Sequence, residues 1–257
     1  MEGMFYRRTF RIAFIAAYCV IPAHAQAGTA AEFEAASVRP NTLGDRIVTI
    51  NVGPGPRFNA RGYTLKLLLQ RAFGMKGFQI AGGPPWLDVD RYDVAAVASA
   101  SLGAANLTEE QLQPMLRALL ADRFRLRFHQ ERKELPGFAL AAIGSSKLKA
   151  SASKVEQSEN GVRRRGAAIV GEAVSTATLA KILGAYLTRP VADETGLKGL
   201  YDFELAWTER ADQVAAEDAA GISLPAALQD QLGLRLVPRK VPTDIIVIDD
   251  VEKASPN

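Results

Sequence analysis

The chain has 257 residues, of which 48% are hydrophobic and 23% are charged, and its formal net charge is +3. This is the composition of an ordinary globular protein, with enough chain for one large or two small cores. Its one cysteine, Cys19, excludes an intramolecular disulfide and a site built from several thiolates.

The N-terminus has the pattern of a secretory signal peptide. Three arginines, at positions 7, 8 and 11, precede an uncharged run over residues 12–21. Small residues, Ala23 and Ala25, then precede Gln26. The alternative, a membrane anchor, needs about 20 apolar residues, and this run is roughly half as long. We therefore expect residues 1–25 to be cleaved, by either the general or the twin-arginine export route.

Cleavage would also change the charge of the chain. Removing residues 1–25 takes three arginines and one glutamate from 31 basic and 28 acidic side chains, which leaves 28 and 27. The basicity thus lies mostly in the signal peptide, and we expect neither nucleic acid nor an acidic membrane as a partner. Cys19 leaves with the signal, so the mature chain would have no thiol. We expect a periplasmic or extracellular protein with no transmembrane helix after cleavage.

Hydrophobic periodicity predicts the elements of the first half. Alternating residues indicate strands at 32–39, 46–52, 78–81 and 92–98. A helix is expected over 63–73, with Gly74 as its C-cap, because its apolar residues recur at helical spacing. Thr108 and Gln111 have the spacing of a capping box, but Pro114 favours a helix that begins only there.

One unit occurs twice. Residues 115–142 contain a Leu-rich helix, a strand at 124–128, a basic kink and a second strand after Pro136, and residues 226–249 repeat this order. The apolar face of the helix at 178–187 also matches that at 65–73. The prediction is an α+β fold of two similar lobes from an internal duplication, each with mainly antiparallel strands covered by two helices. Its boundaries are 26–144 for the first lobe, 145–160 for a linker and 161–257 for the second lobe.

Four stretches carry a resemblance to a known family: residues 33–41, 115–140, 191–205 and 228–253. In this order they resemble the exported proteins of soil bacteria that share one domain of unknown function, the DUF3738-type family. The resemblance implies an exported α+β protein with no established activity. Some relatives occur beside membrane-embedded metallopeptidases, but this chain has no H-E-x-x-H motif, so that property does not carry over.

Catalytic chemistry finds little support. His129 is the only histidine after the predicted cleavage site, and we interpret it as a solvated surface residue. Asp88, Asp90 and Asp93 lie close in sequence but lack the pattern of a calcium loop. We interpret residues 163–165, three arginines, as a solvated edge, and residues 193–199 as a glycine turn, not a phosphate loop. No catalytic residue, metal site or cofactor is predicted.

Trp86 is the strongest candidate for a partner contact, with Pro85 and Tyr92 beside it. It follows Gly82, Gly83 and two prolines, a rigid loop that would present the indole. The alternative is that Trp86 packs on the strand that begins at Tyr92, and Trp207 is expected in the core.

Two functions follow from these observations. The first is an exported interaction module that binds an envelope protein, a peptide or a glycan. The alternative is a carboxylate-based hydrolase of an envelope or extracellular polymer, with Asp88 or Asp90 acting with Glu131 or Glu134. A glycosidase would need its two carboxyl groups about 5–9.5 Å apart across a groove.

Overall fold

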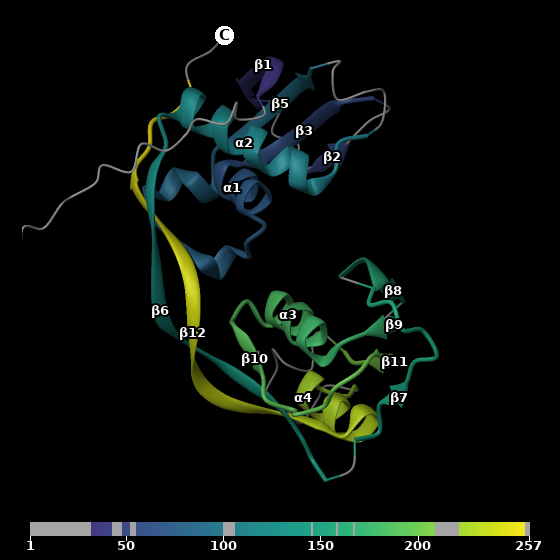
Figure 1. The fold of residues 1–257 in the computed structure, drawn as a ribbon. Coiled ribbons are helices and arrows are strands. Elements are labelled where there is room, and N and C mark those ends of the chain that lie inside the picture. The colour runs from purple at the N-terminus through teal and green to yellow at the C-terminus, as the bar shows by residue number, and fades with distance from the viewer. Residues whose placement is uncertain are drawn as a thin grey trace, which may run out of the picture. The chain divides into compact units, whose positions relative to one another are not determined.

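The computed structural model describes residues 32–42, 48–51, 55–99, 106–144, 146–157, 159–166, 168–208 and 221–254. The prediction of a signal peptide at 1–25 lies outside these residues. The described part contains four helices and three sheets and confirms the α+β class (Figure 1). The helices are α1 (Leu65–Phe73), α2 (Glu109–Phe124), α3 (Thr176–Leu187) and α4 (Leu224–Ala227), which continues as a π-helical turn over Leu228–Leu232.

Each of the three sheets has four strands. The first sheet has the order β1-β5-β3-β2 and is antiparallel; its strands are β1 (Phe33–Pro40), β5 (Arg91–Ala98), β3 (Arg57–Thr64) and β2 (Thr49–Asn51). The third sheet has the order β7-β11-β9-β8 and is also antiparallel; its strands are β7 (Lys149–Ala150), β11 (Tyr201–Ala206), β9 (Ala168–Val174) and β8 (Val162–Arg165).

The second sheet, which we call the ribbon sheet, has the order β10-β6-β12-β4. Its two inner strands, β6 (Arg127–Ala142) and β12 (Leu234–Asp250), are antiparallel and run side by side over almost their whole length (Figure 1). The short strands β10 (Val191–Asp193) and β4 (Ile80–Gly82) pair in parallel with β6 and β12, respectively. The prolines of the ribbon lie where their own strand has no second neighbour, so their missing N–H groups leave no ladder bond unmade.

The ribbon corrects the predicted hairpins. We expected a strand, a kink and a second strand within 124–142, and the same order again near the C-terminus. Instead each stretch forms one long strand, and the two strands pair with each other, from Leu234 opposite Ala142 to Ile248 opposite Phe128. Cross-strand bonds between segments about a hundred residues apart thus replace two local hairpins.

Helix α1 has the predicted position and face. Thr64 is its N-cap, and its side chain accepts a hydrogen bond from the N–H of Leu67 at 3.3 Å. Gly74 ends the helix at φ 61°, a left-handed conformation that costs glycine little. The residues predicted for the apolar face are inside, and four are fully buried: Leu65, Leu68, Leu69 and Ala72.

Helix α2 begins earlier than predicted. The capping box of Thr108 and Gln111 is formed, and the helix runs from Glu109 with Pro114 inside it. Pro114 therefore stands at the sixth helical position, where its ring removes the N–H that would bond the carbonyl of Glu110. The prediction that the regular helix starts at Pro114 is wrong, because the cap and five buried leucine and methionine side chains outweigh one lost bond.

Two hydrophobic cores bury the inner faces of these elements. The first joins the first sheet to α1 and α2 and takes in Ile246 and Ile248 from the C-terminal end of β12. The second joins the third sheet to α3 and α4 and takes in Leu140 from β6 and Leu234 from β12. Trp207 is 6% exposed within this second core, as predicted. Both cores therefore depend on the ribbon.

Candidate functional site

One face of the first sheet is covered by helices, and the other is open. Along β3, Phe58, Ala60 and Gly62 are buried, whereas the residues between them are exposed. The register places the open positions side by side: Arg39 opposite Asp93, Ser37 opposite Ala95 opposite Asn59, and Thr49 opposite Arg61. We call this surface the exposed face; its residues are Ser37, Arg39, Thr49, Arg57, Asn59, Arg61, Asp93, Ala95 and Val97.

The exposed face is hollowed. A shallow depression of about 510 Å³ is lined by residues of all four strands, including Ser37, Arg39, Asn59, Arg61 and Ala95. The hollow forms because Ala95 and Ser37 have short side chains, whereas longer side chains, among them Arg39 and Arg61, stand beside them. Small residues at the centre of a sheet allow another chain to approach the backbone closely.

Asp93 is the one carboxylate of the exposed face, and the protein itself binds it. Its Oδ1 accepts hydrogen bonds from the side-chain amide of Asn41 and from the backbone N–H of Gly62, each at 2.8 Å. Gly62 has φ 68° and lies in an irregularity of the β3–β5 register between Ala60 and Tyr63. This bulge aims its N–H at Asp93, so Asp93 serves to hold the two strands together.

The arginines of the exposed face differ in this respect. Within the described residues, Arg39 and Arg57 have no ion pair with any carboxylate, and both are exposed. Because Asp93 is engaged inside the sheet, Arg39 and Arg57 give their part of the face a positive charge. A guanidinium binds carboxylates through a planar fork of N–H donors, so the face is suited to an anionic partner.

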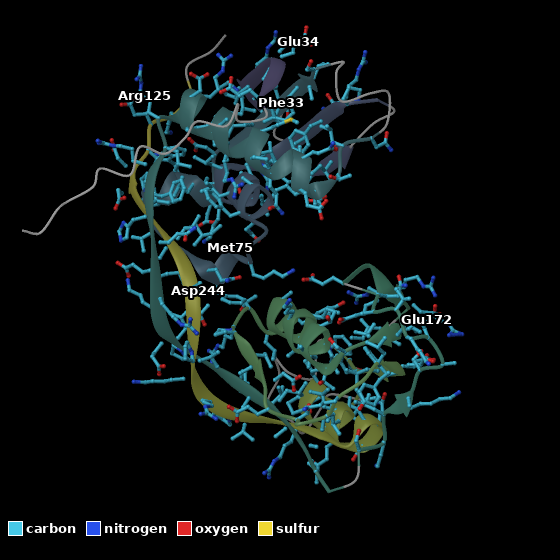
Figure 2. All side chains as sticks on the ribbon, in the orientation of Figure 1. Phe33, Glu34, Met75, Arg125, Glu172 and Asp244 are labelled. Carbon is cyan, nitrogen blue, oxygen red and sulfur yellow. The ribbon has the colours of Figure 1, made fainter. Side chains whose placement is uncertain are left out.

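The third sheet has an equivalent arrangement of its four strands, but ion pairs neutralise arginines on its open face. Arg163 pairs with Glu172 at 2.6 Å, and Arg165 pairs with Glu204 at 3.6 Å. Glu172 lies at the surface of this sheet (Figure 2). In each sheet an aspartate binds the N–H of a positive-φ residue, Gly62 to Asp93 and Ala173 to Asp202.

The two hydrogen bonds, from Gly62 to Asp93 and from Ala173 to Asp202, allow the other positions of the first and third sheets to be compared. The residue before each positive-φ residue is Arg61 in the first sheet and Glu172 in the third. The second residue after each aspartate is Ala95 in the first sheet and Glu204 in the third. Equivalent positions therefore carry acids in the third sheet and an arginine or a small residue in the first, so the open faces of these two sheets differ in charge.

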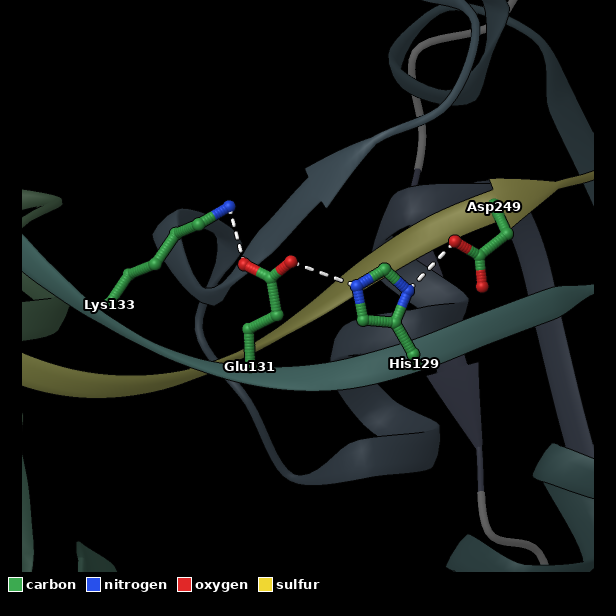
Figure 3. Close-up of polar contacts among 4 residues, drawn as sticks. All are labelled: His129, Glu131, Lys133 and Asp249. Carbon is green, nitrogen blue, oxygen red and sulfur yellow. Dashed lines mark hydrogen bonds and ion pairs between the residues drawn. The ribbon is translucent and has the colours of Figure 1, made fainter.

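A second polar cluster lies on the ribbon. The ring of His129 is held between two carboxylates, with Nδ1 at 2.8 Å from Asp249 and Nε2 at 2.9 Å from Glu131 (Figure 3). Lys133 contacts the other oxygen of Glu131 at 2.6 Å. His129, Glu131 and Lys133 alternate along β6, which puts them on one side of the strand, and Asp249 comes from β12. We call these four residues the histidine cluster.

The histidine cluster is organised for charge pairing. Hydrogen bonds that the ring donates to the carboxylates of Glu131 and then Asp249 raise the pKa of His129, because both favour the imidazolium. The pKa of Glu131 is lowered, chiefly by its bond to Lys133 and then by that to His129. Both ring nitrogens of His129 are engaged by carboxylates, so neither is free to accept a proton from a substrate in this arrangement.

The cluster does not present a metal site either. No group of three or more histidine, cysteine or acidic side chains in the described residues is arranged to hold a metal ion. The geometry gives the reason, because Glu131 and Asp249 face opposite nitrogens of the same ring. Their oxygens therefore do not converge on one point, as metal ligands must.

The predicted partner-contact residues have different environments. Trp86 lies in a 3₁₀ turn (Pro85–Asp88), is partly buried and packs against the first core. The ammonium of Lys253 lies 5.6 Å from the centre of its ring. Pro85 is exposed, whereas Tyr92 is only 2% exposed and packs edge-on against Phe124. The ring of Tyr92 thus belongs to the core, and a partner contact by Trp86 and Pro85 stays a prediction.

The acids considered for hydrolysis are not brought together by their contacts. Asp88 pairs with Lys66 at 3.0 Å, and Asp90 pairs with Lys253 at 2.6 Å. Glu131 belongs to the histidine cluster on β6. No local sequence pattern indicates that Asp249 reaches His129, because the pairing of β6 with β12 joins segments far apart in the chain. The exposed arginines of β3 could have been found from the alternation of Arg57, Asn59 and Arg61.

Comparison with known proteins identifies the family of this chain. The model of the DUF3738 family, described as a protein of unknown function, matches residues 66–251. The chain therefore belongs to the DUF3738 family. No curated protein and no solved structure matches it. Within the described residues, the longest and most apolar helices still fall short of what a membrane span requires.

Proposed function

We propose that this chain is an exported binding module that acts in the periplasm or outside the cell, and that its contact surface is the exposed face of the first sheet. The observation that carries the proposal is the pair Arg39 and Arg57, two exposed guanidinium groups without a carboxylate partner in the described residues. Arg39 lines the hollow and Arg57 lies on the same face of β3, whereas the third sheet has ion pairs at its open face.

Charge placement supports this reading. A surface arginine paired with a neighbouring acid is already compensated and has little to offer a partner. An arginine beside short side chains keeps its donors available and can form two parallel hydrogen bonds to one carboxylate. The first sheet therefore presents arginine N–H donors that a partner can reach. In the third sheet the arginine donors are already paired with acids of the same sheet.

Export is the second part of the proposal, and it rests on the sequence of residues 1–25. The expected mature N-terminus is Gln26. Intact-mass measurement of the protein recovered from the periplasm or the medium tests it. A mass that still includes residues 1–25 would contradict cleavage.

The architecture part of the proposal is an internal duplication into two lobes. In its support, the pairings β3–β5 and β9–β11 are both antiparallel. In each case a helix and a short strand that joins the ribbon lie between the two paired strands in the chain. The short strand of each half pairs with the long strand of the other: β4 with β12 and β10 with β6. We propose that the ancestral unit formed this sheet with a second copy of itself.

Binding is tested with matched variants. The double variant Arg39→Gln, Arg57→Gln removes the uncompensated charges, and Arg163→Gln, Arg165→Gln removes the same charge from the third sheet. Each purified protein is immobilised and exposed to fractionated cell-envelope and culture-medium components. We expect a retained component that the first variant loses and the second keeps. Equal retention by both variants would contradict the proposal. So would the absence of any component that the unaltered protein retains.

The hydrolase alternative has less support. It required two carboxyl groups facing each other across a groove, one of them able to donate a proton at neutral pH. Asp88, Asp90 and Glu131 are each paired with a lysine, and the lowered pKa of Glu131 makes it a poor proton donor. No described contact favours this function over binding.

A further inference from the structure

We propose that the outer edge of β1 is a second binding site, which takes an extended, partly basic peptide segment of another protein as an added antiparallel strand. The site goes beyond the proposed function, because it uses the border of the first sheet and not its exposed face. Three features carry it: the open backbone groups of β1, a groove between β1 and α2, and the charge of that groove.

Strand β1 is a border strand of the first sheet, and none of the described strands pairs with its outer edge (Figure 1). It has eight residues, whereas β7, its counterpart in the third sheet, has two. Unpaired N–H and C=O groups along such an edge can bond the backbone of an added strand. The first sheet therefore has a longer open edge than the third.

The hydrogen bonds show which backbone groups of β1 point outward. The N–H of Asn41 donates to the carbonyl of Arg91 at 2.8 Å, so the odd-numbered positions of β1 from 35 onward face β5. The carbonyl of Ala36 faces the other way, because it accepts a hydrogen bond from the side chain of Arg123 at 3.3 Å. The N–H groups of Ala36 and Val38 therefore point away from β5, where an added strand can accept from them.

A groove of about 480 Å³ lies between β1 and α2. Met115 and Leu119, which are almost fully buried, form its floor, and the short side chains of Ala36 and Ala118 leave it open. In an antiparallel pair, the residue opposite Ala36 has its side chain on the same side of the sheet as Ala36, which is the side of α2. Alternate side chains of the ligand thus meet α2, and small apolar ones fit there.

The groove is acidic at the start of β1. Its lining includes three acids and one cation: Glu32, Glu34, Asp122 and Arg123. Arg123 is already engaged by Asp122 at 3.1 Å and by the carbonyl of Ala36. Glu32 and Glu34 are exposed, and neither has an ion pair within the part of the chain that the structure describes (Figure 2). These two carboxylates favour a ligand with basic side chains at the end beside them.

A second copy of this chain fits the groove less well. Its own β1 would be the added strand, and the side chains of β1 on the side of α2 include Phe33, Ala36 and Val38. Val38 is fully buried and Phe33 stacks on Phe58 of the same chain, so neither is available to the groove of another copy. A separate peptide segment has no such core to fill, and its apolar side chains can enter.

The probe for the test is a fluorescein-labelled heptapeptide amide, Ser-Val-Ser-Val-Lys-Val-Lys, whose binding to the purified protein is followed by fluorescence anisotropy. Its valines supply the alternate apolar side chains. Its lysines lie at the C-terminal end, which an antiparallel strand places beside Glu32 and Glu34. We expect saturable binding that a peptide with glutamates in place of the lysines does not show. Equal binding of both peptides would overturn the inference.

Methylation of peptide nitrogens separates strand addition from contact through side chains alone. In the antiparallel arrangement the N–H groups of the valines face β1, and those of the lysines face away. We expect N-methylation of the valines to weaken binding at least about tenfold, and N-methylation of the lysines to leave it within about threefold. Equal weakening by the two changes would overturn the added strand.

Ala36→Pro tests the edge from the side of the protein. It removes an outward N–H and places a ring at the edge, without removing a bond to β5, as Pro40 already does further along β1. We expect heptapeptide binding at least about tenfold weaker, with a urea midpoint close to that of the unaltered protein. Ala36→Ser keeps the N–H and should keep binding. A folded Ala36→Pro variant that binds like the unaltered protein would overturn the site.

Matched charge variants test the acidic end of the groove. Glu32→Gln, Glu34→Gln should weaken binding at least about fivefold, since the contacts with both lysines lose their charge. Glu134→Gln, Asp230→Asn changes the net charge equally at two exposed acids without an ion pair among the described residues, and should leave binding within about twofold. Equal weakening by both pairs would mean that net charge alone attracts the probe, which would overturn the site.

Two further measurements separate this site from the exposed face and from self-association. Arg39→Gln, Arg57→Gln should leave heptapeptide binding within about twofold, because both side chains lie on the side of the sheet away from α2. A loss of binding in that variant would overturn the edge as the site, whereas the envelope-component experiment tests the exposed face alone. In sedimentation equilibrium, a dimer that Ala36→Pro converts to a monomer would make a second copy the occupant and overturn the peptide.

Discussion

The backbone N–H of Ala173 donates a hydrogen bond to Oδ1 of Asp202 at 2.8 Å, and Ala173 has φ 53°. A left-handed conformation costs an alanine about 1–2 kcal/mol, so something must hold it. The carboxylate of Asp202 does so from the adjacent strand β11, as that of Asp93 does for Gly62 in the first sheet. Asp202 therefore fixes the bulge from which α3 begins.

This contact predicts a pH-dependent stability. The N–H of Ala173, followed by the hydroxyl of Ser151, lowers the pKa of Asp202 below its ordinary value. A lowered folded-state pKa means that the stabilisation is present above the unfolded-state pKa, about 3.9, and is lost as pH falls through the folded value. We expect Asp202→Asn to lower the urea midpoint at pH 7 and to differ much less from the unaltered protein near pH 2–3.

The control for Asp202→Asn is Asp244→Asn. Asp244 lies on the ribbon with a long, exposed contact to Arg132 of 3.9 Å (Figure 2). Its removal should hardly change the urea midpoint at either pH. A constant difference between Asp202→Asn and the unaltered protein across the pH range would show that the carboxylate charge does not stabilise the bulge.

The histidine cluster predicts the opposite sign. Hydrogen bonds from the ring to the carboxylates of Glu131 and Asp249 raise the pKa of His129 above 6.5. A raised folded-state pKa means that the stabilisation is complete below the unfolded-state value and is lost as pH rises through the folded one. Nuclear magnetic resonance titration of the imidazole signals measures the pKa of His129. The signal of His129 is assigned by its loss in His129→Gln. Glu131→Gln and Asp249→Asn should each lower that pKa, and a value at or below 6.5 in the unaltered protein would contradict the cluster.

Pro114 gives a stability prediction. It stands inside α2, where it removes one helical hydrogen bond, and replacement by alanine restores the N–H facing the carbonyl of Glu110. We expect Pro114→Ala to raise the free energy of unfolding by about 1–3 kcal/mol, as measured by urea denaturation. Pro225 in the first turn of α4 is the control, because no bond is missing there; Pro225→Ala should not stabilise. Equal effects of both changes would rule out the missing bond as the cause.

The fold was predictable where a segment has its own strong pattern. The apolar face of α1, its glycine cap and the strand β5 are readable from residue spacing, and so is the N-cap Ser223 of α4. Strands β3 and β9 were missed, because their inward residues include small ones such as Ala60, Gly62 and Gly171. Small residues bury well but give a weak hydrophobic alternation.

The ribbon and the histidine cluster were not predictable for a different reason. Periodicity over residues 127–142 fits one long strand as well as a hairpin, and only the partner decides. That partner, β12, begins about ninety residues further along the chain. The contact between His129 and Asp249 depends on the β6–β12 register, so it too required the tertiary structure. The exposed face likewise needed the strand order before its arginines could be seen together.

Trp86 supplies the last prediction, which separates packing from recognition. The indole is partly buried against the first core, and Lys253 lies over it while pairing with Asp90 at 2.6 Å. Full burial of an aromatic side chain makes its replacement by alanine cost about 3–5 kcal/mol, so partial burial should make it cost about 2–3 kcal/mol. Val89, which is 70% exposed, is the control, and Val89→Ala should change stability by less than about 0.5 kcal/mol.

Urea unfolding measures both variants, and retention of the envelope component is measured on the same samples. If the exposed face alone makes the contact, Trp86→Ala loses stability and keeps retention, because that face lies on the strands. A variant of unchanged stability that no longer retains the component would instead make Trp86 the contact residue.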